Sequence, residues 1–297
     1  EHPASMSAMK KWAKNTQRNH IIVEHNNDSG SVDEQAYIKK LTSDVRVVSI
    51  VHTSPVTGMT VDLEKITKEV RNVTPDCIII VDGIQHSSHG AIDVQKYDID
   101  GYVVSPYKMF SRHGYGVAWA SDRLCTLNKE QLTGGPFQNW ELGTRDAGSY
   151  ATFSDVVDYL DWLGSNFTES ENTRERLEAS SIAIKSHEQE LVDLVINGAE
   201  DIVGLRNNKK IRIIGNSAST SREGVVSFFQ KNKPSSIIVE ELRQRKIRVH
   251  IRKDDHYCGN ILRPLNQKDC IRFSICHYNS KAEVVEFMKA INEISTN

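Results

Sequence analysis

Three residues whose side chains could do chemistry together follow two short apolar stretches. Asp82 and Gln85 come after residues 77–81, and Lys108 comes after residues 101–106. Short runs of β-branched residues are typical of strands that are buried on both faces of a parallel sheet. Ligands of such sheets bind just beyond the carboxyl ends of the strands. The sequence therefore predicts that a carboxylate, a carboxamide and an amine meet at one edge of a sheet.

A buried carboxylate and a buried lysine are costly unless each has a partner. Pyridoxal phosphate would satisfy both, because its pyridinium nitrogen binds an aspartate and its aldehyde forms a Schiff base with a lysine. Lys108 would have to react as the unprotonated amine. The hypothesis is a pyridoxal-phosphate site in which Lys108 is catalytic and Asp82 binds the cofactor.

The sequence around these residues resembles a known family. The stretch DGIQHSSHGAIDVQ, followed by DIDGYVVSPYK, is similar to the cofactor signature of the class V aminotransferases, which include cysteine desulfurases and selenocysteine lyases. Seven residues fall in register with that signature: Asp82, Gln85, His89, Asp93, Asp100, Ser105 and Lys108. The resemblance implies the fold of fold-type I pyridoxal-phosphate enzymes. That fold has a mostly parallel, doubly wound α/β sheet in a large domain and a small α+β C-terminal domain.

The resemblance also assigns cofactor contacts. Gln85 would bind the phenolic oxygen, Ser105 would donate to the phosphate, and Tyr107 stands where desulfurases usually have a phosphate-binding histidine. His2 would stack on the cofactor ring, although a histidine at a chain end is by itself usually disordered. Thr144, in GGPFQNWELGTRD, would reach the cofactor phosphate of the partner subunit in a homodimer. On the sequence alone, a threonine there is better explained as a turn or N-cap residue.

The substrate and the reaction depend on two further residues. Arg272, in CIRFSIC, matches the family arginine that binds the α-carboxylate of the substrate, for which a guanidinium fork is well suited. Without the resemblance, it would be an outward-facing strand arginine. Cys258, in RKDDHYCGN, matches the loop cysteine that attacks sulfur in desulfurases. However, His250 replaces an expected arginine nearby, and free cysteines are commonly inert.

The resemblance thus implies an enzyme that acts on an amino acid, as a cysteine desulfurase-like protein or C–S lyase. The alternatives are an aminotransferase or epimerase without a catalytic cysteine, and a non-catalytic homologue. Two features depart from the family pattern. Pro55 stands where the family usually has an asparagine, and proline has neither a polar side chain nor a backbone N–H. Family members also carry a glycine-rich phosphate-binding turn before this point, so we expect the chain to be N-terminally incomplete.

Composition bounds the remaining possibilities. A chain of 297 residues is long enough for two domains. A net charge of -2 gives no reason to expect nucleic acid as a partner, and no apolar run approaches the ~20 residues of a membrane helix. Five cysteines without paired spacing favour a reducing compartment, and hence a cytoplasmic protein. The histidines and cysteines of residues 250–277 lack metal-ligand spacing, so no metal is predicted.

Alternating strands and helices indicate the large cofactor-binding domain over residues 1–168. Its strands are expected at 20–25, 45–52, 77–82, 101–106 and 114–121, with helices at 31–41 and after residue 62. An amphipathic helix over about 171–198 leads into the small domain, residues 169–297. Strands are expected there at 211–215, 224–229, 247–252 and 271–276, and helices at about 236–246 and 281–294. Ser280 and Glu283 form a predicted capping box.

Overall fold

The computed structural model describes residues 2–27 and 32–296, which divide into two compact units. Unit 1 comprises Glu1–Lys40, Thr53–Val61 and Ile182–Asn297, and unit 2 comprises Leu41–His52 and Asp62–Ser181. Each unit therefore joins segments that are distant in the sequence. The division into large and small domains at residues 168 and 169 stays a prediction.

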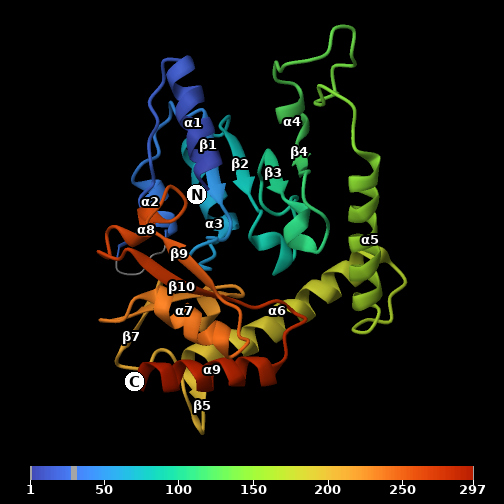
Figure 1. Cartoon of the computed structure of the whole chain (residues 1–297). Coiled ribbons are helices and arrows are strands. Elements are labelled where there is room, and N and C mark those ends of the chain that lie inside the picture. Colours follow the sequence, from blue (N-terminus) through green and yellow to red (C-terminus); the bar gives the residue numbers. More distant parts are fainter. Residues whose placement is uncertain (1, 28–31, 297) are drawn as a thin grey trace. The chain divides into compact units, whose positions relative to one another are not determined.

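Unit 2 is built on a four-stranded sheet with the order β1-β2-β3-β4 (Figure 1). The strands are β1 (Val47–Val51), β2 (Ile78–Asp82), β3 (Gly101–Val104) and β4 (Val117–Ala120). The first three run parallel, and β4 pairs antiparallel with β3. β-Branched residues dominate β1 and β2, as their preference for a packed, pleated surface requires. The sheet confirms the predicted α/β class.

A helix joins the first two strands. Helix α3 (Leu63–Val73) begins after Asp62, whose carboxylate accepts a hydrogen bond from the first turn at 3.1 Å. Leu63, Ile66 and Val70 form its buried face, as the sequence predicted. A helical crossover lets β1 and β2 run parallel, so their carboxyl ends lie at the same edge of the sheet.

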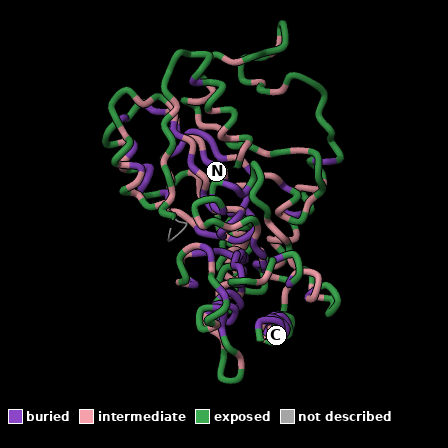
Figure 2. Tube along the Cα trace, turned by 60° about the vertical axis from the view of Figure 1, so that its left-hand side comes forward, coloured by how far each residue is buried: buried purple, intermediate pink, exposed green. Residues whose placement is uncertain are grey.

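The rest of unit 2 contains α4 (Asp122–Cys125), α5 (Ala147–Gly164) and the first part of α6 (Thr173–Asn197). The loop between α4 and α5 is mostly exposed, whereas buried residues concentrate in β1, β2 and β3 (Figure 2). Two short 3-10 turns, His86–Ser88 and Pro106–Met109, follow β2 and β3 respectively. Gln85 and His89 flank the first turn, and Lys108 lies within the second.

Unit 1 contains an antiparallel sheet with the order β7-β8-β10-β9. Its strands are β7 (Ile211–Ile214), β8 (Val225–Gln230), β9 (His250–Lys253) and β10 (Asp269–Ser274). Its other elements include α1 (Pro3–Asn15), α2 (Glu34–Ile38), α7 (Ser235–Gln244), α8 (Gly259–Leu262), α9 (Lys281–Thr296) and the small pair β5 (Gly198–Ala199) and β6 (Ile202–Val203). The strands and helices predicted after residue 200 are confirmed within a few residues.

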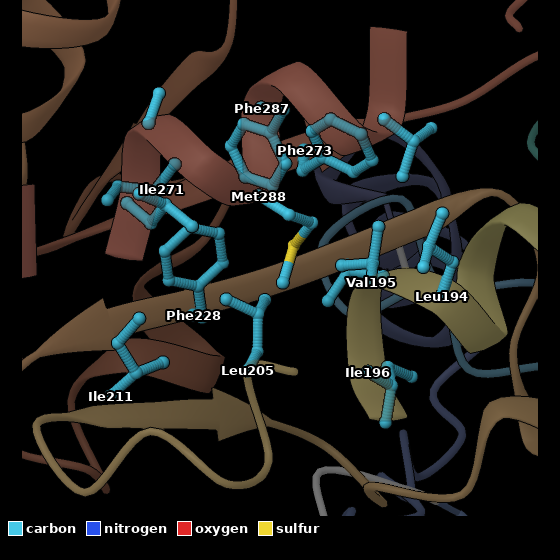
Figure 3. Packing of buried hydrophobic residues seen from close by; sticks show 14 of the residues in the cluster. Leu194, Val195, Ile196, Leu205, Ile211, Phe228, Ile271, Phe273, Phe287 and Met288 are labelled. Atoms are coloured by element: carbon cyan, nitrogen blue, oxygen red, sulfur yellow. The ribbon is translucent and has the colours of Figure 1, made fainter. Parts of the chain in front are cut away.

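The core of unit 1 lies where the sheet meets its helices. Phe228 of β8, Ile271 of β10, and Phe287 and Met288 of α9 belong to one buried cluster (Figure 3). The rings of Phe273 and Phe287 stack with their centroids 4.1 Å apart. Burying such side chains supplies the main favourable term in folding, about 1.5–3 kcal/mol for each large one.

Two local predictions have opposite outcomes. The capping box is confirmed, because Glu283 accepts from the Ser280 N–H at 2.7 Å and Ser280 Oγ accepts from the Glu283 N–H at 3.3 Å. The strand predicted over residues 20–25 is wrong: the segment is irregular, and Ile21 and Ile22 are half exposed. An apolar run forms a strand only where a neighbouring strand pairs its backbone groups, and the structure shows no such neighbour within the described residues.

Membrane insertion of a helix has no support from the structure. Across residues 2–27 and 32–296, every helix is too short or too polar to cross a bilayer.

Candidate active site

The predicted site residues of unit 2 follow neighbouring parallel strands. Asp82 is the last residue of β2 and lies opposite Val103 of β3. Gln85 lies just beyond β2, next to the turn His86–Ser88, and Lys108 lies within the turn that follows β3. The parallel register therefore brings an acid, an amide and an amine to the same edge of the sheet.

A hydrogen-bonded chain links three of these side chains. Lys108 Nζ donates to Gln85 Oε1 at 2.9 Å. Gln85 Nε2 lies 3.1 Å from His89 Nε2 on the other side of the amide. Gln85 and His89 are buried, and Lys108 is half-buried. The contact between Lys108 and Gln85 thus confirms that the two strand ends meet.

The turn after β2 owes its shape to close packing. Asp82 Oδ1 accepts from the Ile84 N–H at 3.1 Å, which fixes the carboxylate beside its own backbone. A Cβ atom at Gly83 would collide with the ring of Tyr102. Glycine is therefore needed after Asp82 so that the chain can pass over that ring.

A layer of aromatic side chains lies around this turn. His52 Nδ1 lies 2.9 Å from the hydroxyl oxygen of Tyr102, and the His52 and His86 rings stack with centroids 3.6 Å apart. His86 Nε2 also contacts the carbonyl oxygen of Ala91 at 3.1 Å. No role for His52 or His86 was predicted from the sequence. Their positions after β1 and after β2 were the available signal, because parallel strands end together.

Asp100, which directly precedes β3, links β3 to β2. It is fully buried, and its carboxylate binds Arg71 at 2.9 Å, Arg123 at 2.7 Å and the backbone N–H of Ile79 at 2.9 Å. Burial alone would raise the pKa of Asp100, but these hydrogen bonds and the two cations lower it below the usual value for aspartate. Asp100 therefore remains ionised and holds the strands that carry Asp82 and Lys108.

The remaining predicted residues of unit 2 are less enclosed. Ser105 immediately precedes the turn Pro106–Met109, and its carbonyl oxygen accepts from the Lys108 N–H at 2.9 Å. Tyr107 is exposed and stacks on His113 with centroids 4.2 Å apart. Thr144 is exposed in the loop before α5. The cofactor contacts assigned to Ser105, Tyr107 and Thr144 stay predictions.

Two predicted residues of unit 1 have local partners. His2 caps α1, where its Nδ1 accepts from the backbone at 3.1 Å, and its ring centroid lies 5.4 Å from that of Tyr257. Arg272, on β10, donates from Nη1 to the carbonyl oxygen of Pro55 at 3.0 Å. Pro55, which lacks the asparagine side chain of the family, thus contributes its carbonyl group. The roles of His2 and Arg272 toward cofactor and substrate stay predictions.

Cys258 occupies an apolar setting. It is 1% exposed and belongs to a cluster with Cys270, Leu262 and other apolar side chains. Burial raises the pKa of the Cys258 thiol; Arg252 and Arg272 oppose this effect and Asp255 adds to it. The thiol is therefore protonated at neutral pH, which is typical of an unreactive cysteine. A nucleophilic role for Cys258 stays a prediction.

Comparison with known proteins decides the family. The profile described as Aminotransferase class-V matches residues 1–287. The chain belongs to the class V aminotransferase family. Members of this family depend on pyridoxal phosphate, so the predicted cofactor is the family's own.

Class V relatives of the chain include proteins with different names. It is 25% identical to the "Probable cysteine desulfurase 2" of Mycobacterium leprae, over 86% of this chain and 58% of that protein. It is 26% identical to the "Aminotransferase-like protein FGM3" of Gibberella zeae, over 89% of this chain and 62% of that protein. The chain thus spans about 60% of the length of these relatives.

A solved structure shares the fold. The cysteine desulfurase of Thermococcus onnurineus NA1 superposes with a TM-score of 0.79 at 20% identity, covering all of this chain and 71% of that one. This likeness confirms the predicted fold-type I architecture.

The residues of unit 2 fit the family's cofactor chemically. Pyridoxal phosphate needs an amine for its aldehyde and a carboxylate for its ring nitrogen, and Lys108 and Asp82 supply these at neighbouring strand ends. Gln85 Oε1 already holds the amine at 2.9 Å. The donor set therefore matches the group that the family uses.

Proposed function

We propose that the chain is, or forms part of, a pyridoxal-phosphate-dependent enzyme that acts on an amino acid, with Lys108 as the amine that bonds to the cofactor. The observation that carries this proposal is the 2.9 Å contact between Lys108 Nζ and Gln85 Oε1. It supports the proposal because Gln85 follows β2, the strand that ends at Asp82, and ligands of parallel sheets bind beyond such strand ends.

Each polar group of this edge has a separate task. Bound pyridoxal phosphate supplies an electron-withdrawing ring, which stabilises negative charge at the α-carbon of an amino acid. Asp82 would pair its carboxylate with the ring nitrogen, Gln85 would offer its carboxamide to the phenolic oxygen, and the hydroxyl of Ser105 would bind the phosphate. Lys108 Nζ holds the reactive amine, and its hydrogen bond to Gln85 keeps that amine in one place.

Binding of the substrate is assigned to Arg272 in this proposal. Arg272 would bind the α-carboxylate, since its planar fork forms two parallel charge-assisted bonds. His2 would stack on the cofactor ring. Thr144 of unit 2 would serve the cofactor of a second copy, which makes a homodimer in the cytoplasm the proposed working form.

A cysteine desulfurase-like reaction is the finer proposal. It is favoured by the names of the relatives and by the match of Cys258 to the loop cysteine of desulfurases. Burial raises the pKa of the Cys258 thiol, and the nearby Arg252 and Arg272 oppose that rise. Sulfur transfer to Cys258 would require the thiol to become exposed and deprotonated. An aminotransferase or epimerase reaction needs no such step and is the alternative.

Absorption spectroscopy tests the proposal directly. Pyridoxal phosphate added to the purified chain should give a visible band, and Lys108→Ala should remove it because Lys108 is the amine proposed to bond to the cofactor. Lys96→Ala is the matched control, since Lys96 belongs to the same unit and its side chain is 68% exposed. Sulfide release from L-cysteine, with and without Cys258→Ser, then separates desulfuration from the alternatives. An equal band in wild type and Lys108→Ala would overturn the assignment of Lys108.

A further inference from the structure

One carboxamide connects the amine of Lys108 to a buried imidazole. Gln85 Oε1 accepts from Lys108 Nζ at 2.9 Å, and Gln85 Nε2 lies 3.1 Å from His89 Nε2. Gln85 is 9% exposed and His89 is 3% exposed, so water cannot readily replace either partner. The spacing of four residues between Gln85 and His89 lets one tight turn bring the two side chains together.

The two contacts together determine which way the amide points. An ammonium group has only hydrogens to donate, so it requires the oxygen of the amide. The amide nitrogen then faces His89 and needs an acceptor there. A neutral histidine provides that acceptor at Nε2 only when its own proton is on Nδ1.

We propose that His89 is a positioning residue, whose Nε2 accepts from the Gln85 amide and thereby holds Gln85 Oε1 toward Lys108. If Nε2 carried a proton, it would face the N–H groups of the amide, and the amide would turn its NH₂ toward Lys108. A buried donor without an acceptor is strongly disfavoured, so the amide follows the state of His89. The inference rests on the proposed function for the importance of Lys108, but the geometry is independent of the cofactor.

Another histidine of the same turn provides a natural comparison. His86 is also buried, but its Nε2 contacts the carbonyl oxygen of Ala91 and its ring stacks on His52. A substitution at His86 therefore disturbs the turn without removing the acceptor of the amide.

The first test determines the tautomer of His89 in the wild-type chain. Long-range ¹H–¹⁵N spectra of the cofactor-free, ¹⁵N-histidine-labelled chain distinguish a proton on Nδ1 from one on Nε2. The resonance of His89 is identified, among the 11 histidines, by its loss in His89→Gln. A proton on Nδ1 at neutral pH supports the proposal, and a proton on Nε2 overturns it.

The second test follows the reactivity of Lys108. Competitive acetylation of the cofactor-free chain, read by mass spectrometry, gives the fraction of Lys108 modified at each pH. In His89→Leu the amide loses the acceptor that anchors its NH₂, so Oε1 is held toward the Lys108 ammonium less firmly, which favours the neutral amine. The midpoint of the pH profile should therefore fall by about one pH unit, equivalent to about 1.4 kcal/mol. The His89 variants all keep Asp82 and His86, the other titratable side chains of residues 82–90.

Two conservative variants distinguish positioning from simple filling of space. The amide of His89→Gln reaches the position of Nε2 and should restore the wild-type profile, whereas the shorter amide of His89→Asn reaches only the position of Nδ1 and should not. His86→Leu should leave the midpoint unchanged. Equal behaviour of the Gln and Asn variants would overturn the proposal, even if His89→Leu does not fold. Because no cofactor is present, these outcomes are separate from failure of the proposed function.

Discussion

The turn that carries Lys108 and the loop that carries Cys258 surround their nucleophilic atoms differently. Lys108 Nζ has a polar partner, Gln85 Oε1, at 2.9 Å. The thiol of Cys258 lies in an apolar cluster, and burial raises its pKa. The first setting holds a reactive group in a defined place, whereas the second suppresses reactivity. The setting of Lys108 thus suits the proposed bond to the cofactor, while sulfur chemistry at Cys258 requires a further change.

The largest effect is expected for Asp100, the buried carboxylate that holds together the strands carrying Asp82 and Lys108. Asp100→Asn removes the partner charge of Arg71 and Arg123 and should destabilise unit 2 by about 3–5 kcal/mol. Asp98→Asn is the control, because Asp98 is exposed, also pairs with Arg71, and should cost at most about 1 kcal/mol. Hydrogen exchange of the Ile79 amide, which donates to Asp100, measures the loss. Equal protection in both variants would contradict the supporting role of Asp100.

The same carboxylate predicts a dependence on pH. Its folded-state pKa is lowered, so its contribution to stability is complete above the unfolded value of about 3.9 and is lost as the pH falls through the lower folded value. The protection of Ile79 in the wild type should therefore decline only below about pH 4. In Asp100→Asn this part of the decline should be absent.

The positions of Asp82, Gln85 and Lys108 were largely predictable from the sequence, and the environment of Cys258 was not. Asp82, Gln85 and Lys108 follow apolar runs, and the parallel register that brings such strand ends together is a general property of α/β sheets. The environment of Cys258 depends instead on packing with residues such as Ile214 and Phe229, which are distant in the sequence. The roles of Asp100 and His89 were missed for the same reason. Their partners become evident only when the turns and strands are placed in space.

A thiol that is suppressed by burial should react slowly. We expect Cys258 to be labelled by iodoacetamide more slowly than Cys125, which is less buried. Each unit by which a thiol pKa is raised lowers the thiolate fraction about tenfold. The labelling rate of Cys258 should therefore keep rising with pH above 9.0, the ordinary value. Mass spectrometry of the native chain measures both rates, and denaturant should remove the difference between them.

Rapid labelling of Cys258 in the native chain would reverse the comparison. It would show that the loop opens readily, which would strengthen the desulfurase-like proposal. Slow labelling that becomes fast only when an amino acid and pyridoxal phosphate are added would instead locate the required change in the substrate-bound state.

The smallest effect concerns the cations near the thiol. His250 lies opposite Arg272 in the pairing of β9 with β10, and burial together with the charges of Arg272, Arg252 and Arg248 lowers its pKa. Because the folded value lies below the unfolded one, this group favours the folded state above about pH 6.5 and weakens it as the pH falls. An NMR titration of the His250 ring should show a midpoint below that value.

Removing one cation then tests whether the positive charge of Arg252 acts on both His250 and Cys258. Arg252→Gln should raise the pKa of His250 and also that of Cys258, because Arg252 lowers both. Loss of this positive charge favours the protonated forms of His250 and Cys258. Arg212→Gln, on the opposite edge strand β7, should change neither. A shift at His250 without one at Cys258 would show that the thiol is governed by its apolar cluster alone, so that only exposure of Cys258 could make it a nucleophile.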